Sequence, residues 1–208
     1  MGKSVLILGT ARAGTSMTCG VVKRLGVNVL SSTPPPHSLL HNPKGNYEFG
    51  PFMALGDQIN KKLAGLPHQD IDELIQTQIF PHCPSEEDWG FKVLGHQSVP
   101  YLLPYIPNPH IICVFRNFYD QANSFQQLRK TNDQVETPLP VIIAEIAKAY
   151  HEIAEMTLEL SSHIPVAHVS YLSLRTGPTQ EAERLARFLE IDVTNQMLAD
   201  ITEYVDVI

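Results

Sequence analysis

The residues best placed to do chemistry lie in two short segments, each of which directly follows an apolar run. The first segment follows Ser4–Leu8 and reads Gly9-Thr10-Ala11-Arg12-Ala13-Gly14-Thr15-Ser16. Glycines five residues apart let backbone N–H groups wrap an anion, and a helix that begins at Thr15 adds partial positive charge there. Arg12 supplies a fixed positive charge, and the residues that follow Gly14 supply hydroxyl donors. The segment Thr10 to Ser16 is therefore predicted to bind a phosphate-like group.

This loop matches the frame of a nucleotide-hydrolysing P-loop except at one position. Thr15 stands where that pattern has the lysine that reaches the β and γ phosphates of a nucleoside triphosphate. The candidate strand His110–Phe115 is followed by Arg116, and no apolar strand candidate ends in an aspartate that would hold Mg²⁺. These features argue against a P-loop kinase and predict an anion site without a metal. The alternative is an ordinary strand-to-helix turn in which Arg12 faces solvent.

The second segment reads Arg116-Asn117-Phe118-Tyr119-Asp120-Gln121-Ala122-Asn123-Ser124. Arg116 at the end of a strand and Ser124 on the following helix can converge on one anion. Ligands of open α/β sheets bind at the carboxyl ends of the strands, so this pair is expected near the first loop. The alternative is local, with Arg116 paired to Asp120 and Ser124 a surface hydroxyl.

The elements that must position these residues alternate between short apolar runs and amphipathic stretches. Strands are predicted over Ser4–Leu8, Val27–Leu30, Phe91–Leu94, His110–Phe115 and Val166–Ser170. Helices are predicted over Thr15–Leu25, Phe52–Leu63, Ile71–Phe80, Leu139–Ser162 and Thr179–Leu189. Continuous apolar strands are expected where both faces of a parallel sheet are covered. The sequence therefore predicts an α/β fold with a doubly wound, mostly parallel sheet and helices on both faces.

Composition limits the remaining possibilities. The 208 residues are 43% hydrophobic and 18% charged, which suits one domain over residues 1–208 with a substantial core. Acidic residues number 22 against 15 basic ones, and this net charge of −7 argues against broad nucleic-acid binding. No stretch approaches the roughly 18 apolar residues of a membrane span. The three cysteines have no metal-ligand spacing, and we expect a cytoplasmic protein without a bound metal.

Together the two segments resemble the sulfotransferase family that uses 3′-phosphoadenosine 5′-phosphosulfate (PAPS). Thr10–Met17 is similar to the family's 5′-phosphosulfate loop, and Arg116 with Ser124 matches its 3′-phosphate pair. Further stretches that resemble family segments, in the same order along the chain, are Asn42–Glu48, Val169–Leu174 and Ala186–Leu189. The resemblance implies a P-loop NTPase-like, sulfotransferase-like fold. It also implies transfer of a sulfuryl group from PAPS to a hydroxyl or amine of a small molecule or saccharide.

The resemblance also implies roles for individual residues. Arg12, where many relatives have lysine, is expected to stabilise the charge that develops on the bridging oxygen. A carboxylate or imidazole should take the proton of the acceptor. Glu48 resembles the glutamate base of some relatives, and His96 follows a strand at its carboxyl end. The weaker candidates for the base are His37 and His41, and the cations that could assist are Lys44 and Lys92.

Two pairs of residues keep a second interpretation open. Asn117 and Phe118 stand where the family has Asp-Pro, and Leu172 and Ser173 stand where it has Glu-Asp. A protein of the same fold could bind PAPS or its product, adenosine 3′,5′-bisphosphate (PAP), without catalysing transfer. In either case residues 31–90 are predicted to form the acceptor side of the site.

Overall fold

In the part of the chain that the structure describes, residues 2–32, 47–84, 86–93, 95–132 and 136–206, five strands form one parallel sheet. This structure is a computed structural model. The strands are β1 (Ser4–Leu8), β2 (Asn28–Val29), β3 (Trp89–Val93), β4 (Pro109–Phe115) and β5 (Val166–Ser170). Their order is β2-β3-β1-β4-β5, and all four neighbouring pairs are parallel. Helices connect the strands, which confirms the predicted doubly wound α/β fold.

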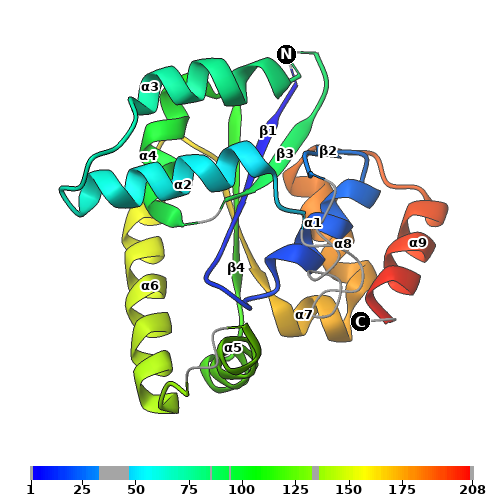
Figure 1. Ribbon diagram of the computed structural model, residues 1–208. Helices are drawn as coiled ribbons and strands as arrows, with labels where there is room; N and C mark the ends of the chain where they lie inside the picture. The colour runs from blue at the N-terminus through cyan, green and yellow to red at the C-terminus, as the bar shows by residue number, and fades with distance from the viewer. Residues whose placement is uncertain (1, 33–46, 85, 94, 133–135, 207–208) are drawn as a thin grey trace.

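The helices cover both faces of the sheet (Figure 1). They are α1 (Thr15–Arg24), α2 (Gly50–Leu63), α3 (Ile71–Leu74), α4 (Val99–Leu102), α5 (Phe118–Asn132), α6 (Leu139–Leu160), α7 (Tyr171–Thr176), α8 (Pro178–Phe188) and α9 (Asn195–Asp206). Helices α2, α3 and α6 lie on one side of the sheet, and α1, α8 and α9 lie on the other (Figure 1). Helix α5 lies beyond the carboxyl end of β4 (Figure 1).

The sheet separates two hydrophobic cores. Leu6 and Leu8 belong to the core that also contains residues of α2 and α6, whereas Val5 and Ile7 belong to the core beneath α1 and α8. This alternation follows from the two-residue period of a strand. Because both faces are covered, all five residues of β1 are buried. The continuous apolar runs in the sequence are the consequence of this arrangement.

Most of the predicted strands and helices are present with ends within about two residues of the prediction, whereas α4, α7 and α9 were not predicted. β1 and β5 have the predicted ends, whereas β2 is reduced to two residues. The predicted helix Ile71–Phe80 is wrong as one element, because α3 gives way to a π-helical turn over Ile75–Ile79 and then a 3₁₀ turn over Phe80–His82. Pro81 lies in that last turn and has no backbone N–H to continue a helical ladder.

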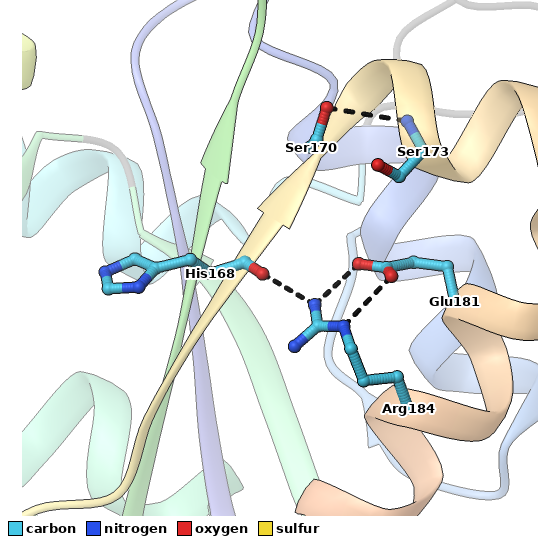
Figure 2. Close-up of polar contacts among 5 residues, drawn as sticks. All are labelled: His168, Ser170, Ser173, Glu181 and Arg184. Atoms are coloured by element: carbon cyan, nitrogen blue, oxygen red, sulfur yellow. Dashed lines mark hydrogen bonds and ion pairs between the residues drawn. The ribbon is translucent and has the colours of Figure 1, made fainter.

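A charged clamp from α8 holds the last strand of the sheet (Figure 2). The Nη2 atom of Arg184 donates to the carbonyl oxygen of His168 in β5 at 2.6 Å, and Nε and Nη2 donate to the carboxylate of Glu181 at 2.9 and 2.5 Å. Glu181 is only 8% exposed. Charge-assisted, bidentate bonds of this kind are stronger than neutral ones. The clamp fixes the end of β5, from which Ser170 caps α7 by accepting from the Ser173 amide at 3.4 Å.

Arg184→Met is expected to lower the free energy of unfolding by about 1–3 kcal/mol, because it leaves a buried carboxylate and a strand carbonyl without their donor. Chemical denaturation measures this difference. Lys61→Met is the control, since it breaks an exposed ion pair with Asp57 at 2.6 Å that should contribute at most about 1 kcal/mol. Equal losses in the two variants would contradict the role given to the clamp.

Candidate functional site

The loop between β1 and α1 has the backbone of an anion cradle. Arg12 has a φ of 66° and Gly14, the N-cap residue of α1, has a φ of 105°, so both are in the left-handed region. Gly14 has no side-chain oxygen that could cap the first turn of α1. A Cβ at Gly14 would lie 2.5 Å from Cδ2 of Tyr171, and one at Gly9 would lie 2.8 Å from the carbonyl oxygen of Val114. Close approach therefore requires glycine at both positions, and the left-handed conformation requires it at Gly14 as well.

Arg116 lies beside this loop because β4 is the neighbour of β1. Leu8 is paired with Cys113, so the residues after the two strands emerge at the same edge of the sheet. The Nη1 atom of Arg116 donates to the carbonyl oxygen of Arg12 at 3.3 Å, and its guanidinium carbon lies 4.4 Å from the centre of the Tyr171 ring. The Nε atom of Arg116 is buried and has no hydrogen-bond partner among the described residues. The two predicted segments are thus in contact.

Arg12 joins the loop to the helix that carries Ser124. Its Nε atom donates to the Oγ atom of Ser124 at 3.0 Å, and its side chain is half-buried. Burial and, next, the positive charge of Arg116 lower the pKa of Arg12. Within the described residues no carboxylate forms an ion pair with Arg12 or Arg116. Two neighbouring guanidiniums without a carboxylate form a site that favours an anion.

A third cation reaches the loop from β3. The Nζ atom of Lys92 lies 2.9 Å from Oε1 of Glu48 and 3.5 Å from Oγ of Ser16. Because β3 is the other neighbour of β1, the side chain of Lys92 reaches the start of α1. Thr15 stands there in place of the lysine of the nucleotide-hydrolysing pattern. The structure therefore brings Glu48 to the loop, through Lys92.

His96 lies in a different contact. Its Nε2 atom is 3.1 Å from Oε2 of Glu152 on α6, and its side chain is 11% exposed. Burial lowers the pKa of His96, while Glu152 opposes that shift. The lowered pKa favours the neutral imidazole, from which Nε2–H can donate to Glu152. The structure gives His96 this carboxylate partner rather than a residue of the loop.

The remaining candidates of the sequence analysis do not belong to this group of contacts. His37, His41, Lys44 and the stretch 42–46 lie outside the described residues. Burial raises the pKa of the thiols of Cys19, Cys83 and Cys113 to about 12, so none is a nucleophile at neutral pH. The described part of the chain contains no group of three or more His, Cys, Asp or Glu side chains suited to a metal ion. Nor does any described helix have the length and apolarity needed to cross a membrane.

The sequence analysis missed two residues that support the site. Gln121 on α5 and Tyr150 on α6 are buried and hydrogen-bonded to each other. Gln121 also donates to the loop, and Tyr150 accepts from the backbone N–H of Arg116. Neither has a spacing that marks it as functional: Tyr150 lies on the core-facing side of α6, and Gln121 is one of several polar residues in α5. Asn117 has a simpler role, because its Oδ1 caps the start of α5 by accepting from Tyr119 and Asp120.

A family model described as the Sulfotransferase family matches residues 4–195. The chain belongs to the sulfotransferase family. This match covers both strand ends that carry the arginines, and it confirms the resemblance on which their predicted roles depend. No curated protein matches the chain.

Solved sulfotransferases share the fold of this family member. Mouse sulfotransferase SULT7A1, complexed with PAP, gives a TM-score of 0.59 at 14% identity, with 98% of this chain and 64% of the mouse chain covered. Sulfotransferase STF1 from Mycobacterium tuberculosis gives a TM-score of 0.61 at 13% identity, with 100% of this chain and 77% of the STF1 chain covered. The sulfotransferase domain from the curacin biosynthetic pathway gives a TM-score of 0.57 at 19% identity, with 95% of this chain and 77% of that domain covered. This chain therefore spans less than two thirds of the mouse protein.

Gly14→Ala is expected to destabilise the protein more than Gly26→Ala does. Both glycines have a positive φ, 105° and 99°, but a Cβ at Gly26 meets nothing within 4 Å, whereas one at Gly14 overlaps the Tyr171 ring. The two variants share the conformational cost of about 1 kcal/mol. Gly14→Ala should lose about a further 1–3 kcal/mol from overpacking. Equal losses in thermal unfolding would show that Tyr171 does not constrain the loop.

Proposed function

We propose that this sulfotransferase-family protein transfers a sulfuryl group from PAPS to a hydroxyl or amine of a small molecule or saccharide. The observation that carries the proposal is the pair of half-buried guanidiniums, Arg12 and Arg116, which meet at the loop without a described carboxylate partner. The crystal structure of the mouse sulfotransferase contains PAP, which supports the choice of nucleotide.

The residues present fit a nucleotide that carries phosphate at both ends. The buried Nε atom of Arg116 lacks a hydrogen-bond partner in the described structure, and a buried donor of this kind calls for an acceptor. A 3′-phosphate would supply that acceptor, with Ser124 close by through its contact with Arg12. The amides of residues 14–16, the hydroxyls of Thr15 and Ser16, and the hydroxyl of Thr10 would hold the 5′-phosphosulfate.

The chemistry follows from charge. PAPS supplies an activated sulfuryl group: the bond from sulfur to the bridging phosphate oxygen breaks, a bond from sulfur to the acceptor forms, and the proton of the acceptor goes to a base. Arg12 and the loop amides stabilise the negative charge on the bridging oxygen. Lys92 adds a positive charge at the start of α1, beside Ser16.

Two residues remain candidates for the base. Glu48 lies nearer the loop, but its Oε1 atom is in an ion pair with Lys92. His96 has a lowered pKa and a carboxylate on Nε2, an arrangement that leaves Nδ1 as the proton acceptor. The pH dependence of sulfate transfer distinguishes these two candidates.

The same proposal covers the wider organisation of the chain. We propose that residues 1–208 form one sulfotransferase-like domain and that 31–90 contribute the acceptor side. Glu48 supports this arrangement, because its side chain contacts Lys92, which lies beside Ser16 of the loop. The free state of all three cysteines supports a reducing, cytoplasmic location.

Calorimetry with PAP, compared with ATP and Mg²⁺, tests the nucleotide assignment. PAP is expected to bind, and ATP with Mg²⁺ is expected to bind weakly, because Thr15 replaces the lysine of the nucleotide-hydrolysing pattern. Transfer of labelled sulfate from PAPS to a panel of hydroxyl and amine acceptors then tests catalysis. PAP binding without transfer to any acceptor would favour a nucleotide-binding protein that does not catalyse. Preferential binding of ATP would contradict the proposal.

Arg116→Ala should weaken the binding of PAP far more than that of adenosine 5′-phosphate. The loss for PAP should be about 10–100-fold, the range expected when a charge-assisted contact to phosphate is removed. Arg175→Ala is the matched control, because Arg175 is exposed on α7 and its one hydrogen bond within the described residues goes to the hydroxyl of Tyr171. A similar loss for both ligands would refute the assignment of Arg116 to the 3′-phosphate.

The pH profile of sulfate transfer distinguishes the two bases. If His96 is the base, activity falls as the pH drops through a pKa below the ordinary histidine value of about 6.5, because only the neutral imidazole accepts a proton. Glu152→Gln removes the group that raises the pKa of His96, so this acid limb should move to lower pH. An unmoved limb, together with a loss of about 100-fold or more in Glu48→Gln and not in His96→Asn, would assign the base to Glu48.

A further inference from the structure

A buried amide ties the loop to the rest of the site. Gln121 is fully buried, and its Nε2 atom donates to the carbonyl oxygen of Ala11 at 2.6 Å and to the hydroxyl oxygen of Thr10. A carbonyl can only accept, so the nitrogen of the Gln121 amide must face the loop and its oxygen must face away. The orientation of this side chain is therefore fixed by its partners.

The amide oxygen continues the chain of hydrogen bonds to the second segment. The hydroxyl of Tyr150 donates to Oε1 of Gln121 at 2.5 Å and accepts from the backbone N–H of Arg116 at 3.0 Å. Tyr150 is 6% exposed, and the rings of Phe115 and Phe118 pack against it at 5.1 and 5.3 Å. A directed path thus runs from the Arg116 backbone through Tyr150 and Gln121 to the loop, and Tyr150 also hydrogen-bonds to the side chain of Thr10 in that loop. Hydrogen bonds in such a path strengthen one another.

The path matters because it controls which groups of the loop face an anion. The carbonyl oxygen of Thr10 accepts from the Ala13 amide at 3.1 Å, that of Ala11 accepts from Gln121, and that of Arg12 accepts from Arg116. Three consecutive carbonyls are therefore engaged within the protein. A phosphate oxygen would be repelled by a free carbonyl and attracted by an amide, so engaging these carbonyls favours the anion-binding form of the loop.

We propose that Gln121 is a positioning residue that, together with Tyr150, couples the conformation of the loop to the backbone of Arg116, so that the two phosphates of the nucleotide are bound as one unit. This inference rests on the proposed function. It adds a residue that touches neither phosphate but sets the geometry of both phosphate-binding segments. Its loss should weaken binding through the loop and through Arg116 together.

A double-mutant cycle with PAP as the ligand tests the coupling. Gln121→Met and Tyr150→Phe are each expected to weaken PAP binding about 10-fold, and the double variant should be no worse than about 10- to 20-fold, because both changes break one path. Independent roles would instead multiply to about 100-fold, which would overturn the proposal. Gln126→Met is the matched control: Gln126 lies on the same helix and donates to the carbonyl oxygen of Thr137 at 2.8 Å, away from the loop. It should bind PAP as the wild type does, and a loss equal to that of Gln121→Met would also overturn the proposal.

Hydrogen exchange in the free protein separates this inference from the proposed function. Gln121→Met should speed exchange of the amides in residues 10–16 about 10-fold, and Gln126→Met should leave them unchanged. If the wild type does not bind PAP, the proposed function fails. The rate of amide hydrogen exchange then tests whether Gln121 holds the loop in place. Unchanged exchange in Gln121→Met would overturn it.

Gln121→Glu replaces Gln121→Met if the latter does not fold. Its carboxylate still accepts from Tyr150 but repels the Ala11 carbonyl, whereas its protonated form can donate to that carbonyl. PAP affinity relative to the wild type should therefore recover as the pH is lowered from about 8 to about 6, since burial raises the pKa of a carboxyl. A ratio that does not change with pH would count against a donor role for Gln121.

Discussion

Two like charges held close together in a half-buried place repel each other, and this repulsion governs the candidate site. Arg12 and Arg116 come from different segments, and burial and mutual repulsion lower the pKa of Arg12. The protein offsets the repulsion with dipoles and a ring: the Arg12 carbonyl, the Ser124 hydroxyl and the face of Tyr171. None of these carries a full negative charge. A bound anion would neutralise both guanidiniums at once, so it should stabilise the fold as well as occupy the site.

The parallel sheet brings these charges together. Strand β1 lies between β3 and β4, and all three end at one edge. The sheet therefore brings together three segments that are far apart in the sequence: the loop after β1, Lys92 near the end of β3, and Arg116 after β4. The rule that ligands bind at the carboxyl ends of parallel strands is a consequence of this geometry. The neighbouring helices then fix details that the sheet leaves open, such as the approach of Tyr171 to Gly14.

The sequence was sufficient for the features that depend on local pattern. The glycine spacing predicted the loop, and apolar runs predicted β1 and β5 to the residue. It was insufficient where a contact depends on which element lies next to which. Ser124 was predicted to share an anion with Arg116, and the structure also gives it a bond to Arg12. Gln121 reads as one more polar residue of α5, because a buried amide whose partners lie on other elements has no periodic signature. The roles assigned to Arg12, Glu48 and His96 in catalysis stay predictions.

Two of the positions at which the chain departs from the family pattern, Asn117 and Phe118, keep the local interactions that support Arg116. Asn117 stands where the family has aspartate, and its Oδ1 accepts from the Tyr119 and Asp120 amides at 2.9 and 3.2 Å. Asparagine and aspartate cap helices about equally well, so this replacement leaves the start of α5 in place behind Arg116. Phe118 replaces a proline, and its ring packs against Tyr150, which accepts from the Arg116 amide. Both replacements therefore support Arg116, and neither is by itself a reason to expect a protein that has lost its phosphate contacts.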